Sequence, residues 1–318
     1  MAEAVIDTRG LRRTFGSGKK AVEAVAGIDL RVDEGEIFGF LGPNGAGKTT
    51  TLRMLATLLP PSGGEAAVAG CDLHREPGKV RERIGYVGQE GGAEPVMTGR
   101  QELIFQGRVY RMSAAKARAR AAELLEALDL SSFADRKVQT YSGGQRRRLE
   151  IGLGIVHRPR LVFLDEPTSG LDPQSRARLW DEVRRLRDGG TTIFVTTHYL
   201  EEADALCDRL AIIDQGRIAA IGTPDELKRE IAGDVVTIGV AETEQALQLL
   251  QSEPFVREAE HDEQVIRLYV DRGEQAMLAI LRTLDHGGVG LHTIALNRPS
   301  LDDVFLRKTG RSLREKAA

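Results

Sequence analysis

Short apolar runs alternate with amphipathic stretches over the first two thirds of the chain. Glu36–Leu41, Leu161–Leu164 and Thr192–Thr196 are largely apolar, which is typical of strands buried on both faces of a sheet. Helix-like spacing fills much of the sequence between them, and this alternation continues to about Gly222. We therefore expect an α/β domain with a largely parallel sheet that is covered by helices on both faces.

A longer helical stretch interrupts this alternation. Thr98–Leu130 reads as mostly helical, and Ala114–Leu128 within it is rich in Ala, Arg, Glu and Leu, which all favour helices. We expect the insertion to form a helical subdomain over about residues 90–158.

The pattern changes near residue 225. Thr223 and Pro224 suit the N-cap and the first position of a helix, which we expect over Glu226–Ile231. Beyond it the sequence predicts strand Val235–Val240, helix Glu244–Gln251, strand Phe255–Glu260, strand Gln264–Val270, helix Glu274–Leu284 and strand Leu291–Leu296. This β-α-β-β-α-β order is that of a small ferredoxin-like α+β domain, followed by a helix from Ser300 on. The predicted domains are thus residues 1–225 and 226–318.

Composition narrows the class of protein. In 318 residues, 41% are hydrophobic and 29% charged, the balance of a globular protein with a sizeable core. The formal net charge of −3 argues against a general nucleic-acid binder. Cys71 and Cys207 lie far apart, and we interpret them as buried free thiols. The sequence has no run of 18 apolar residues and no signal-peptide pattern, so we expect a cytoplasmic protein unless a partner holds it at a membrane.

One glycine-rich segment carries a phosphate-binding motif. Gly42–Thr49 fits G-x-x-x-x-G-K-[ST] and lies between the apolar strand and the helix-forming run Thr50–Leu59, the context that a P-loop requires. Its glycines let successive N–H groups point at phosphate oxygens, and the next helix presents its positive end. Lys48 adds a full charge, and Thr49 offers a hydroxyl to Mg²⁺. The predicted nucleotide-binding residues here are Gly42, Pro43, Asn44, Gly45, Ala46, Gly47, Lys48, Thr49 and Thr50.

Two carboxylates follow the strand Leu161–Leu164. Asp165 is placed as a Walker-B Asp is, to hold Mg²⁺, and Glu166 could accept a proton from an attacking water. A strand that ends in Asp-Glu is by itself more often only a strand running into a turn. The P-loop in the same chain favours the catalytic interpretation.

A third element precedes the apolar strand at Leu161. Ser142, Gly143, Gly144 and Gln145 open a helical segment and could form a second anion site, although by themselves they are better explained by Ser142 as a simple N-cap. Together with the P-loop, the Asp-Glu strand and His198 after a later strand, this element resembles the ABC ATPase family in order and spacing.

The resemblance assigns further roles. It implies that Phe15 stacks on adenine, that Gln89 contacts Mg²⁺ and senses a permease, and that His198 contacts the γ-phosphate. It identifies Ser142–Gln145 as the signature motif and Ser169–Asp172 as the D-loop. The catalytic residues are then Glu166, His198 and Gln89, the metal site is Thr49, Gln89 and Asp165, and the cofactors are ATP and Mg²⁺.

A narrower resemblance points to one branch of the family. Thr98–Arg100, Arg146–Glu150 and Arg298–Leu306 look like the daunorubicin-resistance branch of drug exporters. Tyr141 stands where Leu is commoner, and Gly88 where Pro is usual, which makes the segment before Gln89 more flexible. We interpret the basic triplet Arg146–Arg148 as a solvated helix face near nucleotide or Glu residues rather than as a nucleic-acid patch.

The resemblance implies the ATP-hydrolysing subunit of an exporter at the cytoplasmic face of the membrane. Its partners would be a separately encoded integral-membrane permease and a second copy of itself or a homologous ATPase subunit, with no nucleic acid. In the dimer, the signature motif of one copy covers the ATP of the other. Two alternatives stay open: a non-membrane ABC ATPase that remodels ribosomes or DNA, and an exporter of lipid, polysaccharide or ion.

The last predicted helix has one apolar face. Leu301, Val304 and Phe305 follow i, i+3, i+4 spacing, and we expect a monomer to leave this stripe exposed. The stripe either docks on the ATPase domain, the second copy or the permease, or it completes the core of the small domain.

Overall fold

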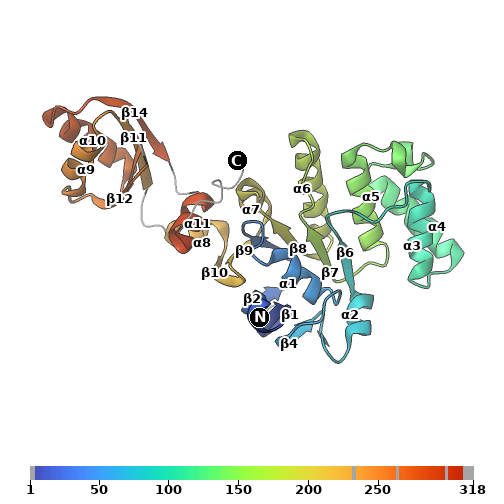
Figure 1. The fold of residues 1–318 in the computed structure, drawn as a ribbon. Coiled ribbons are helices and arrows are strands. Elements are labelled where there is room, and N and C mark those ends of the chain that lie inside the picture. Colours follow the sequence, from blue (N-terminus) through green and yellow to red (C-terminus); the bar gives the residue numbers. More distant parts are fainter. Residues whose placement is uncertain (1–3, 231–233, 263–264, 298–299, 311–318) are drawn as a thin grey trace. The chain divides into compact units, whose positions relative to one another are not determined.

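The computed structural model of the protein describes residues 4–230, 234–262, 265–297 and 300–310. Ile231 and Gln264, each at one end of a predicted element, lie outside the described residues, as do Arg298 and Pro299 of the tail motif. The chain divides into two compact units, residues 1–223 and 224–318 (Figure 1).

A mostly parallel sheet forms the centre of the first unit, with strand order β10-β9-β3-β8-β7-β6. Only the edge strand β10 runs antiparallel to its neighbour. The strands are β3 (Ile37–Leu41), β6 (Ile84–Val87), β7 (Leu161–Asp165), β8 (Thr192–Thr197), β9 (Arg209–Asp214) and β10 (Arg217–Gly222). Every residue of β3, β7 and β8 is buried. The parallel α/β sheet and these three strands are therefore confirmed.

The N-terminal region departs from the predicted alternation of strands and helices. It forms a second, antiparallel sheet of order β2-β1-β4-β5. Its strands are β1 (Ala4–Phe15), β2 (Val22–Asp33), β4 (Gly63–Val68) and β5 (Cys71–Asp72), and a 3₁₀ turn, Gly18–Lys20, joins the first two. Buried and exposed residues are mixed along β1, and four register shifts interrupt its pairing with β2. These irregularities break the strict alternation that identifies a half-buried strand in a sequence.

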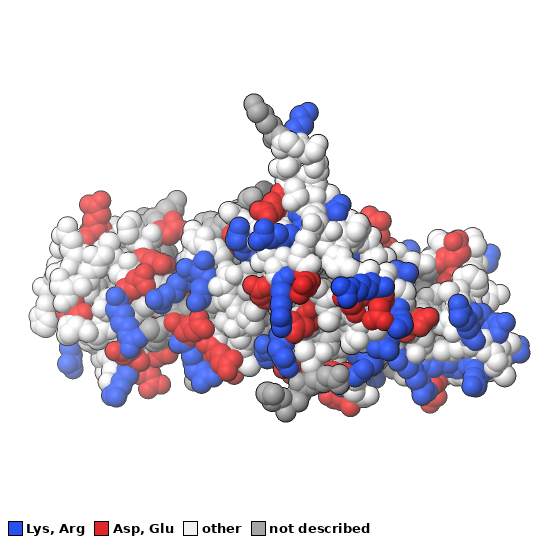
Figure 2. All heavy atoms as spheres, turned by 90° about the horizontal axis from the view of Figure 1, so that it is seen from below, with Lys and Arg blue, Asp and Glu red and all other residues white. Residues whose placement is uncertain are grey.

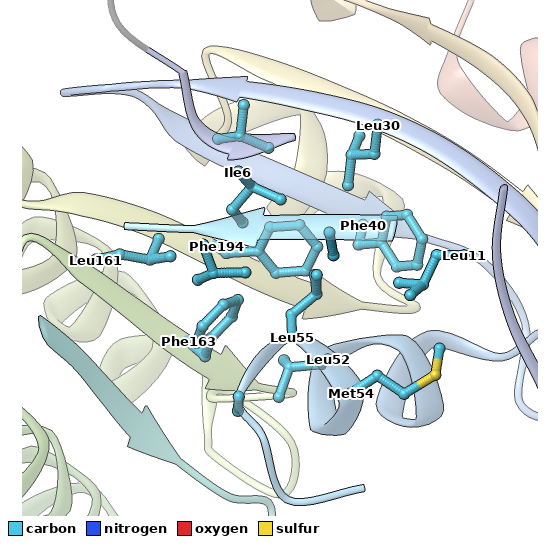
Figure 3. Packing of buried hydrophobic residues seen from close by; sticks show 14 of the residues in the cluster. Ile6, Leu11, Leu30, Phe40, Leu52, Met54, Leu55, Leu161, Phe163 and Phe194 are labelled. Atoms are coloured by element: carbon cyan, nitrogen blue, oxygen red, sulfur yellow. The ribbon is translucent and has the colours of Figure 1, made fainter. Parts of the chain in front are cut away.

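In the main hydrophobic core of the first unit, helix α1 (Lys48–Leu55) packs against the parallel sheet (Figure 3). The ring of Phe194 lies 5.5 Å from that of Phe40 and 5.6 Å from that of Phe163, centroid to centroid. Leu52 and Leu55 of α1 belong to the same buried cluster. Truncating such a buried aromatic residue typically costs about 3–5 kcal/mol. This packing fixes the start of α1, and with it Lys48, at the end of β3.

The remaining helices of the first unit cover the sheet and build the insertion. α2 (Pro77–Arg83) precedes β6. The insertion contains α3 (Gly99–Val109), α4 (Ala114–Ala127) and 3₁₀ turns at Ser131–Phe133 and Val138–Thr140, and it ends with α5 (Gly143–Ile155). α5 packs against β6, α6 (Pro173–Asp188) against β8, and α7 (Leu200–Leu206) against β3. α3 packs on α4 and α5, so the helical character expected for this stretch is confirmed.

The second unit has the predicted ferredoxin-like topology. Its sheet has the order β12-β13-β11-β14 with every neighbouring pair antiparallel. The elements are β11 (Asp234–Val240), α9 (Thr243–Gln251), β12 (Val256–Asp262), β13 (Val265–Val270), α10 (Gly273–His286) and β14 (Leu291–Asn297). Val236, Ile238 and Val240 share one buried cluster with residues of both helices.

Two short helices complete this unit, α8 (Pro224–Glu230) and α11 (Leu301–Thr309). They pack against each other, and Lys308 Nζ lies 2.7 Å from Glu230 Oε2. The expectation that a single chain exposes the apolar stripe of the last helix is wrong, because Leu301, Val304 and Phe305 are all buried. The prediction missed that α8, which precedes the small sheet in the sequence, is available to pair with α11.

Candidate functional site

The topology of the parallel sheet gathers the motifs of the first unit at one edge. β8 lies between β3 and β7, and β6 lies beyond β7, so the loops that follow these strands meet at their carboxyl ends. A cavity of about 680 Å³ opens there. It is lined by Ala24, Asn44, Gly45, Gly47, Lys48, Thr49, Thr50, Gln89, Glu166, Ser169 and His198.

The loop between β3 and α1 has a backbone that only glycine allows at two positions. Gly47 has φ +103°, and a Cβ there would lie 2.5 Å from the carbonyl oxygen of Ala24. A Cβ on Gly42 would collide with the carbonyl of Ile213. This tight curl places the amides of the loop and the first turn of α1 at the cavity. Lys48 Nζ donates to the carbonyls of Gly42 (2.8 Å) and Pro43 (3.1 Å).

Asp165 is completely buried at the end of β7, with its carboxylate beside the start of α1. Its Oδ1 accepts hydrogen bonds from Thr49 Oγ1 (3.1 Å) and Thr196 Oγ1 (2.7 Å). Its Oδ2 is buried and has no hydrogen-bond partner among the described residues. An unpaired buried carboxylate oxygen beside a hydroxyl suits a hard divalent cation such as Mg²⁺.

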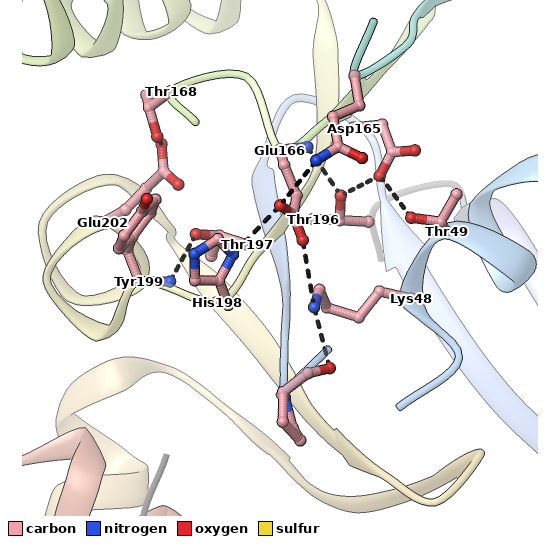
Figure 4. A network of polar contacts seen from close by, with 12 residues as sticks. Lys48, Thr49, Asp165, Glu166, Thr168, Thr196, Thr197, His198, Tyr199 and Glu202 are labelled. Atoms are coloured by element: carbon pink, nitrogen blue, oxygen red, sulfur yellow. Dashed lines mark hydrogen bonds and ion pairs between the residues drawn. The ribbon is translucent and has the colours of Figure 1, made fainter. Parts of the chain in front are cut away.

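Glu166 occupies the centre of a polar network (Figure 4). Its Oε1 lies 3.3 Å from Lys48 Nζ, and its Oε2 lies 3.2 Å from His198 Nδ1 and 3.5 Å from Gln89 Nε2. The close approach of His198 Nδ1 lowers the pKa of Glu166 most, and the charge of Lys48 lowers it further, against the opposing effect of burial. Burial lowers the pKa of Lys48, and the neighbouring Glu166 partly offsets that shift. Glu166 is therefore held as a carboxylate in the cavity.

The backbone of Glu166 is in the left-handed region, with φ +44°. A non-glycine residue there costs about 1–3 kcal/mol and persists only when its surroundings hold it. Its N–H donates to both Oγ1 (3.0 Å) and the carbonyl oxygen (3.2 Å) of Thr196. Thr196 therefore holds both the side chain of Asp165 and the backbone of Glu166 in position. Thr196 was not predicted as a site residue; the available signal was a polar residue in a buried strand, two positions before His198.

The signature segment lies outside this cavity in the single chain. Ser142 and Gln145 form a capping box at the start of α5: Ser142 Oγ accepts from the Gln145 N–H (3.3 Å), and Gln145 Oε1 accepts from the Ser142 N–H (3.0 Å). A Cβ on Gly144 would lie 3.0 Å from Ser175 Oγ. None of residues 142–145 lines the cavity.

Phe15 is also not among the residues that line the cavity. It ends β1 with 40% of its surface exposed, and the guanidinium of Arg13 lies 4.7 Å from its ring centroid. An exposed ring at a strand end can stack on a base, so its adenine role stays a prediction.

The basic triplet on α5 is not a solvated face. Arg147 and Arg148 are only 6% and 9% exposed, while Arg146 is more exposed and has its Nε 3.2 Å from Glu150 Oε1. Arg147 donates to the carbonyls of Asp165 (3.1 Å) and Pro167 (2.9 Å), which flank Glu166. The predicted nearness to Glu residues is confirmed by Glu150, but a solvated face is wrong for Arg147 and Arg148, because charge alone does not reveal that backbone carbonyls satisfy these guanidinium groups.

A second cavity, of about 790 Å³, also includes Gln89 in its lining. Phe105 and Leu58 lie in it with 57% and 54% of their surfaces exposed. Gln89 is therefore shared between this second cavity, which apolar and charged side chains both line, and the cavity of Glu166.

Among the described residues, no group of three or more His, Cys, Asp and Glu side chains could hold a metal ion. Within the same residues, no helix has the length and apolar character needed to cross a membrane.

Two family models match the chain. The model described as ABC transporter matches residues 25–169, which contain every motif that meets at the first cavity except His198. The model described as ATP-binding protein DrrA1-3-like, C-terminal domain, matches residues 222–309.

Curated relatives match almost the full length. The chain is 48% identical to the daunorubicin resistance ATP-binding protein DrrA2 of Streptomyces coeruleorubidus, over 90% of each chain. It is 45% identical to the daunorubicin/doxorubicin resistance ATP-binding protein DrrA of Streptomyces peucetius, over 96% of this chain and 92% of the relative. It is 41% identical to the doxorubicin resistance ATP-binding protein DrrA of Mycobacterium tuberculosis, over 96% and 94%.

Among solved structures, a dimeric ATP-binding cassette in a post-hydrolysis state, bound to ADP and Pi, is similar with a TM-score of 0.63 and 27% identity. The match covers 69% of this chain and 98% of the chain in the solved structure.

Proposed function

Because the chain belongs to the ABC transporter family of ATP-binding subunits, we propose that it powers the export of drugs or similar hydrophobic compounds through a separately encoded membrane permease. ATP binding and ATP hydrolysis coupled to transport are the activities of the family. The near full-length similarity to three resistance ATP-binding proteins supports the choice of cargo.

The observation that carries the catalytic assignment is Glu166, an ionised carboxylate between Lys48 and His198. In this proposal the phosphates of ATP enter the curled loop before α1 and replace Glu166 as the partner of Lys48. Glu166 is then free to accept a proton from water, while His198 and Gln89 orient the reacting groups from either side. Positioning and electrostatic stabilisation do most of the work in phosphoryl transfer.

The metal assignment follows from the same donors. Thr49 and Asp165, with Gln89 in the lining of the same cavity, would hold Mg²⁺, and the unpaired Asp165 Oδ2 supports this. When bound, the ion neutralises phosphate charge and stabilises the transition state. Mg²⁺ commonly uses one or two protein carboxylates plus phosphates and water, which agrees with a site that has a single buried Asp.

A second copy of the chain completes the proposed site. Ser142–Gln145 lie at the N-terminus of α5, where the helix dipole favours a phosphate, but they lie outside the cavity of their own chain. The similarity to a dimeric cassette supports a head-to-tail pair in which this segment covers the nucleotide of the other copy.

The permease contact is proposed at the second cavity. Exposed aromatic and aliphatic side chains such as Phe105 and Leu58 are typical of protein interfaces. Gln89 lines this cavity and also contacts Glu166, so occupation of the cavity can alter the hydrolytic site. This contact would hold the chain at the cytoplasmic face of the membrane.

A nucleic-acid partner has less support. On the face displayed in Figure 2, Lys and Arg side chains are interspersed with Asp and Glu rather than gathered in a basic stripe, whereas nucleic-acid binding normally relies on such a stripe.

Transport from membrane vesicles tests the proposal. Inverted vesicles that contain the full chain and its co-expressed permease should take up fluorescent daunorubicin only when MgATP is added. Vesicles with Glu166→Gln should bind ATP without uptake. If the vesicles hydrolyse ATP but take up no daunorubicin, the ATPase assignment is kept and daunorubicin is rejected as the cargo.

A further inference from the structure

Arg147 joins three segments that the catalytic site uses. Its Nε donates to the Pro167 carbonyl (2.9 Å), its Nη2 to the Asp165 carbonyl (3.1 Å) and its Nη1 to the Gly88 carbonyl (2.7 Å). Asp165 and Pro167 flank Glu166, and Gly88 precedes Gln89. The guanidinium itself sits on α5, five residues after the start of the signature segment at Ser142.

Glu150, one turn further along α5, completes the arrangement. Its Oε2 lies 3.1 Å from Arg147 Nη1 and its Oε1 lies 3.2 Å from Arg146 Nε. A Cβ on Gly91 would collide with the Glu150 carboxylate, so the segment around Gln89 is packed directly against this pair. Both charged groups are almost fully buried and paired, as buried charges must be.

We propose that Arg147 is a positioning residue for hydrolysis, which holds Gln89 in register with Glu166 and links both to α5. The inference rests on the proposed catalytic roles of Glu166 and Gln89. Arg147 does not line the nucleotide cavity, so it acts only through the backbone on either side of those residues.

The guanidinium is suited to this role. Its planar fork fixes the directions of five N–H donors, and here they reach three separate carbonyls. Gly88 has no side chain to restrain its backbone, so the hydrogen bond from Arg147 limits how far Gln89 can move from Glu166. Through Arg147, a movement of residues 88–92 would displace the carbonyls of Asp165 and Pro167 that flank Glu166. A movement of these carbonyls would in turn displace residues 88–92.

Arg147→Lys separates this role from simple support of the fold. Lysine keeps a cation beside Glu150, but its single ammonium group cannot reach all three carbonyls. Because at least one buried carbonyl loses its donor, we expect an unfolding temperature lowered about as much as in the control variant, with ATP affinity within about twofold and kcat reduced by about tenfold.

Arg148→Met is the matched control. Arg148 is a buried arginine on the same helix, but it donates to Leu128 and Asp129 of the helical insertion. Its loss should lower the unfolding temperature while kcat stays within about twofold of the wild type.

The Gln89→Ala background tests whether Arg147 acts through Gln89. In that background Arg147→Lys should lower kcat by no more than about twofold further, because residues that act as a unit are not additive. The inference is overturned if the double variant shows the product of the two single effects on kcat, or if Arg147→Lys alone leaves kcat unchanged.

The wild type and Glu166→Gln, measured alongside, report separately on the proposed function. If the wild type hydrolyses ATP, Glu166→Gln does not, and Arg147→Lys has a normal kcat, then only the role of Arg147 is rejected.

Discussion

Lys48 Nζ and Glu166 Oε1 lie 3.3 Å apart, and both side chains are largely buried. In the proposed mechanism, the cation that would bind phosphate is therefore paired with the carboxylate that would activate water. Under that proposal a nucleotide separates this pair, because the triphosphate brings several negative charges to Lys48. The same exchange would free Glu166 when its substrate arrives.

Glu166→Gln should keep ATP binding and nearly abolish turnover. The amide cannot accept a proton from water, and it removes the charge that competes with phosphate for Lys48, so ATP affinity should be equal or higher. Phosphate release and size-exclusion chromatography in ATP are the measurements, and the variant should accumulate as an ATP-bound dimer. Turnover close to that of the wild type would remove Glu166 from the catalytic role.

Lys48→Ala should weaken nucleotide binding directly. It removes a charge-assisted contact to phosphate worth about 1.5–3 kcal/mol. The affinity for ATP should fall by about one to two orders of magnitude, as measured by titration with a fluorescent nucleotide. Unchanged affinity would contradict the assignment of the loop before α1.

Thr196→Val tests the hydroxyl that joins the two carboxylate residues. Without it Asp165 loses one donor and the N–H of Glu166 loses one acceptor, so the strained backbone is held less firmly. We expect kcat to fall by about tenfold, which corresponds to about 1.4 kcal/mol in the barrier.

Thr192→Val is the control for that variant. Thr192 is equally buried at the other end of β8, where its hydroxyl accepts from the Gly35 N–H. Thr192→Val should lower stability without lowering kcat. Equal losses of turnover in the two variants would mean that only the stability of β8 matters.

The lowered pKa of Glu166 predicts a pH dependence of stability. Because the native pKa lies below the unfolded value of about 4.3, the ionised group stabilises the fold fully above that pH. This stabilisation is lost as the pH falls through the native pKa. The stability of the wild type relative to Glu166→Gln should therefore be constant near neutral pH and decline in acid.

His198→Ala should reduce this pH dependence of stability, because the nearby His198 imidazole is the largest cause of the lowered pKa of Glu166. Denaturant unfolding of the wild type, Glu166→Gln, His198→Ala and the double variant at several pH values provides the comparison. An identical acid decline with and without His198 would show that this histidine does not hold the carboxylate.

Removal of the second unit should separate chemistry from assembly. A chain that ends at Pro224 keeps every residue of the nucleotide cavity and loses the ferredoxin-like unit. We expect it to bind ATP but to lose capture of the permease or transport, as judged by pull-down and vesicle uptake. Full assembly and export by the shortened chain would show that the second unit is dispensable.

The sequence alone determined three strands of the central sheet, the ferredoxin-like order of the second unit, and the P-loop and Asp165-Glu166 motifs. Each of these depends on short-range information: an apolar run long enough to be buried on both faces, or a loop whose glycines are required by its curl. The neighbouring positions of Lys48, at the start of the helix that follows β3, and Asp165, at the end of β7, follow from the same patterns. Parallel strands place their carboxyl ends at one edge of the sheet.

Tertiary structure decided which side chains contact one another within that frame. The contacts of Lys48 with Glu166, of Thr196 with Asp165, and of Arg147 with Asp165 all join residues that lie far apart in the chain. The apolar face of α11 likewise became buried because α8, far earlier in the sequence, packs against it. Charge and hydrophobic spacing are local properties, whereas the partner that satisfies a buried guanidinium or covers an apolar face is set by how the whole chain folds.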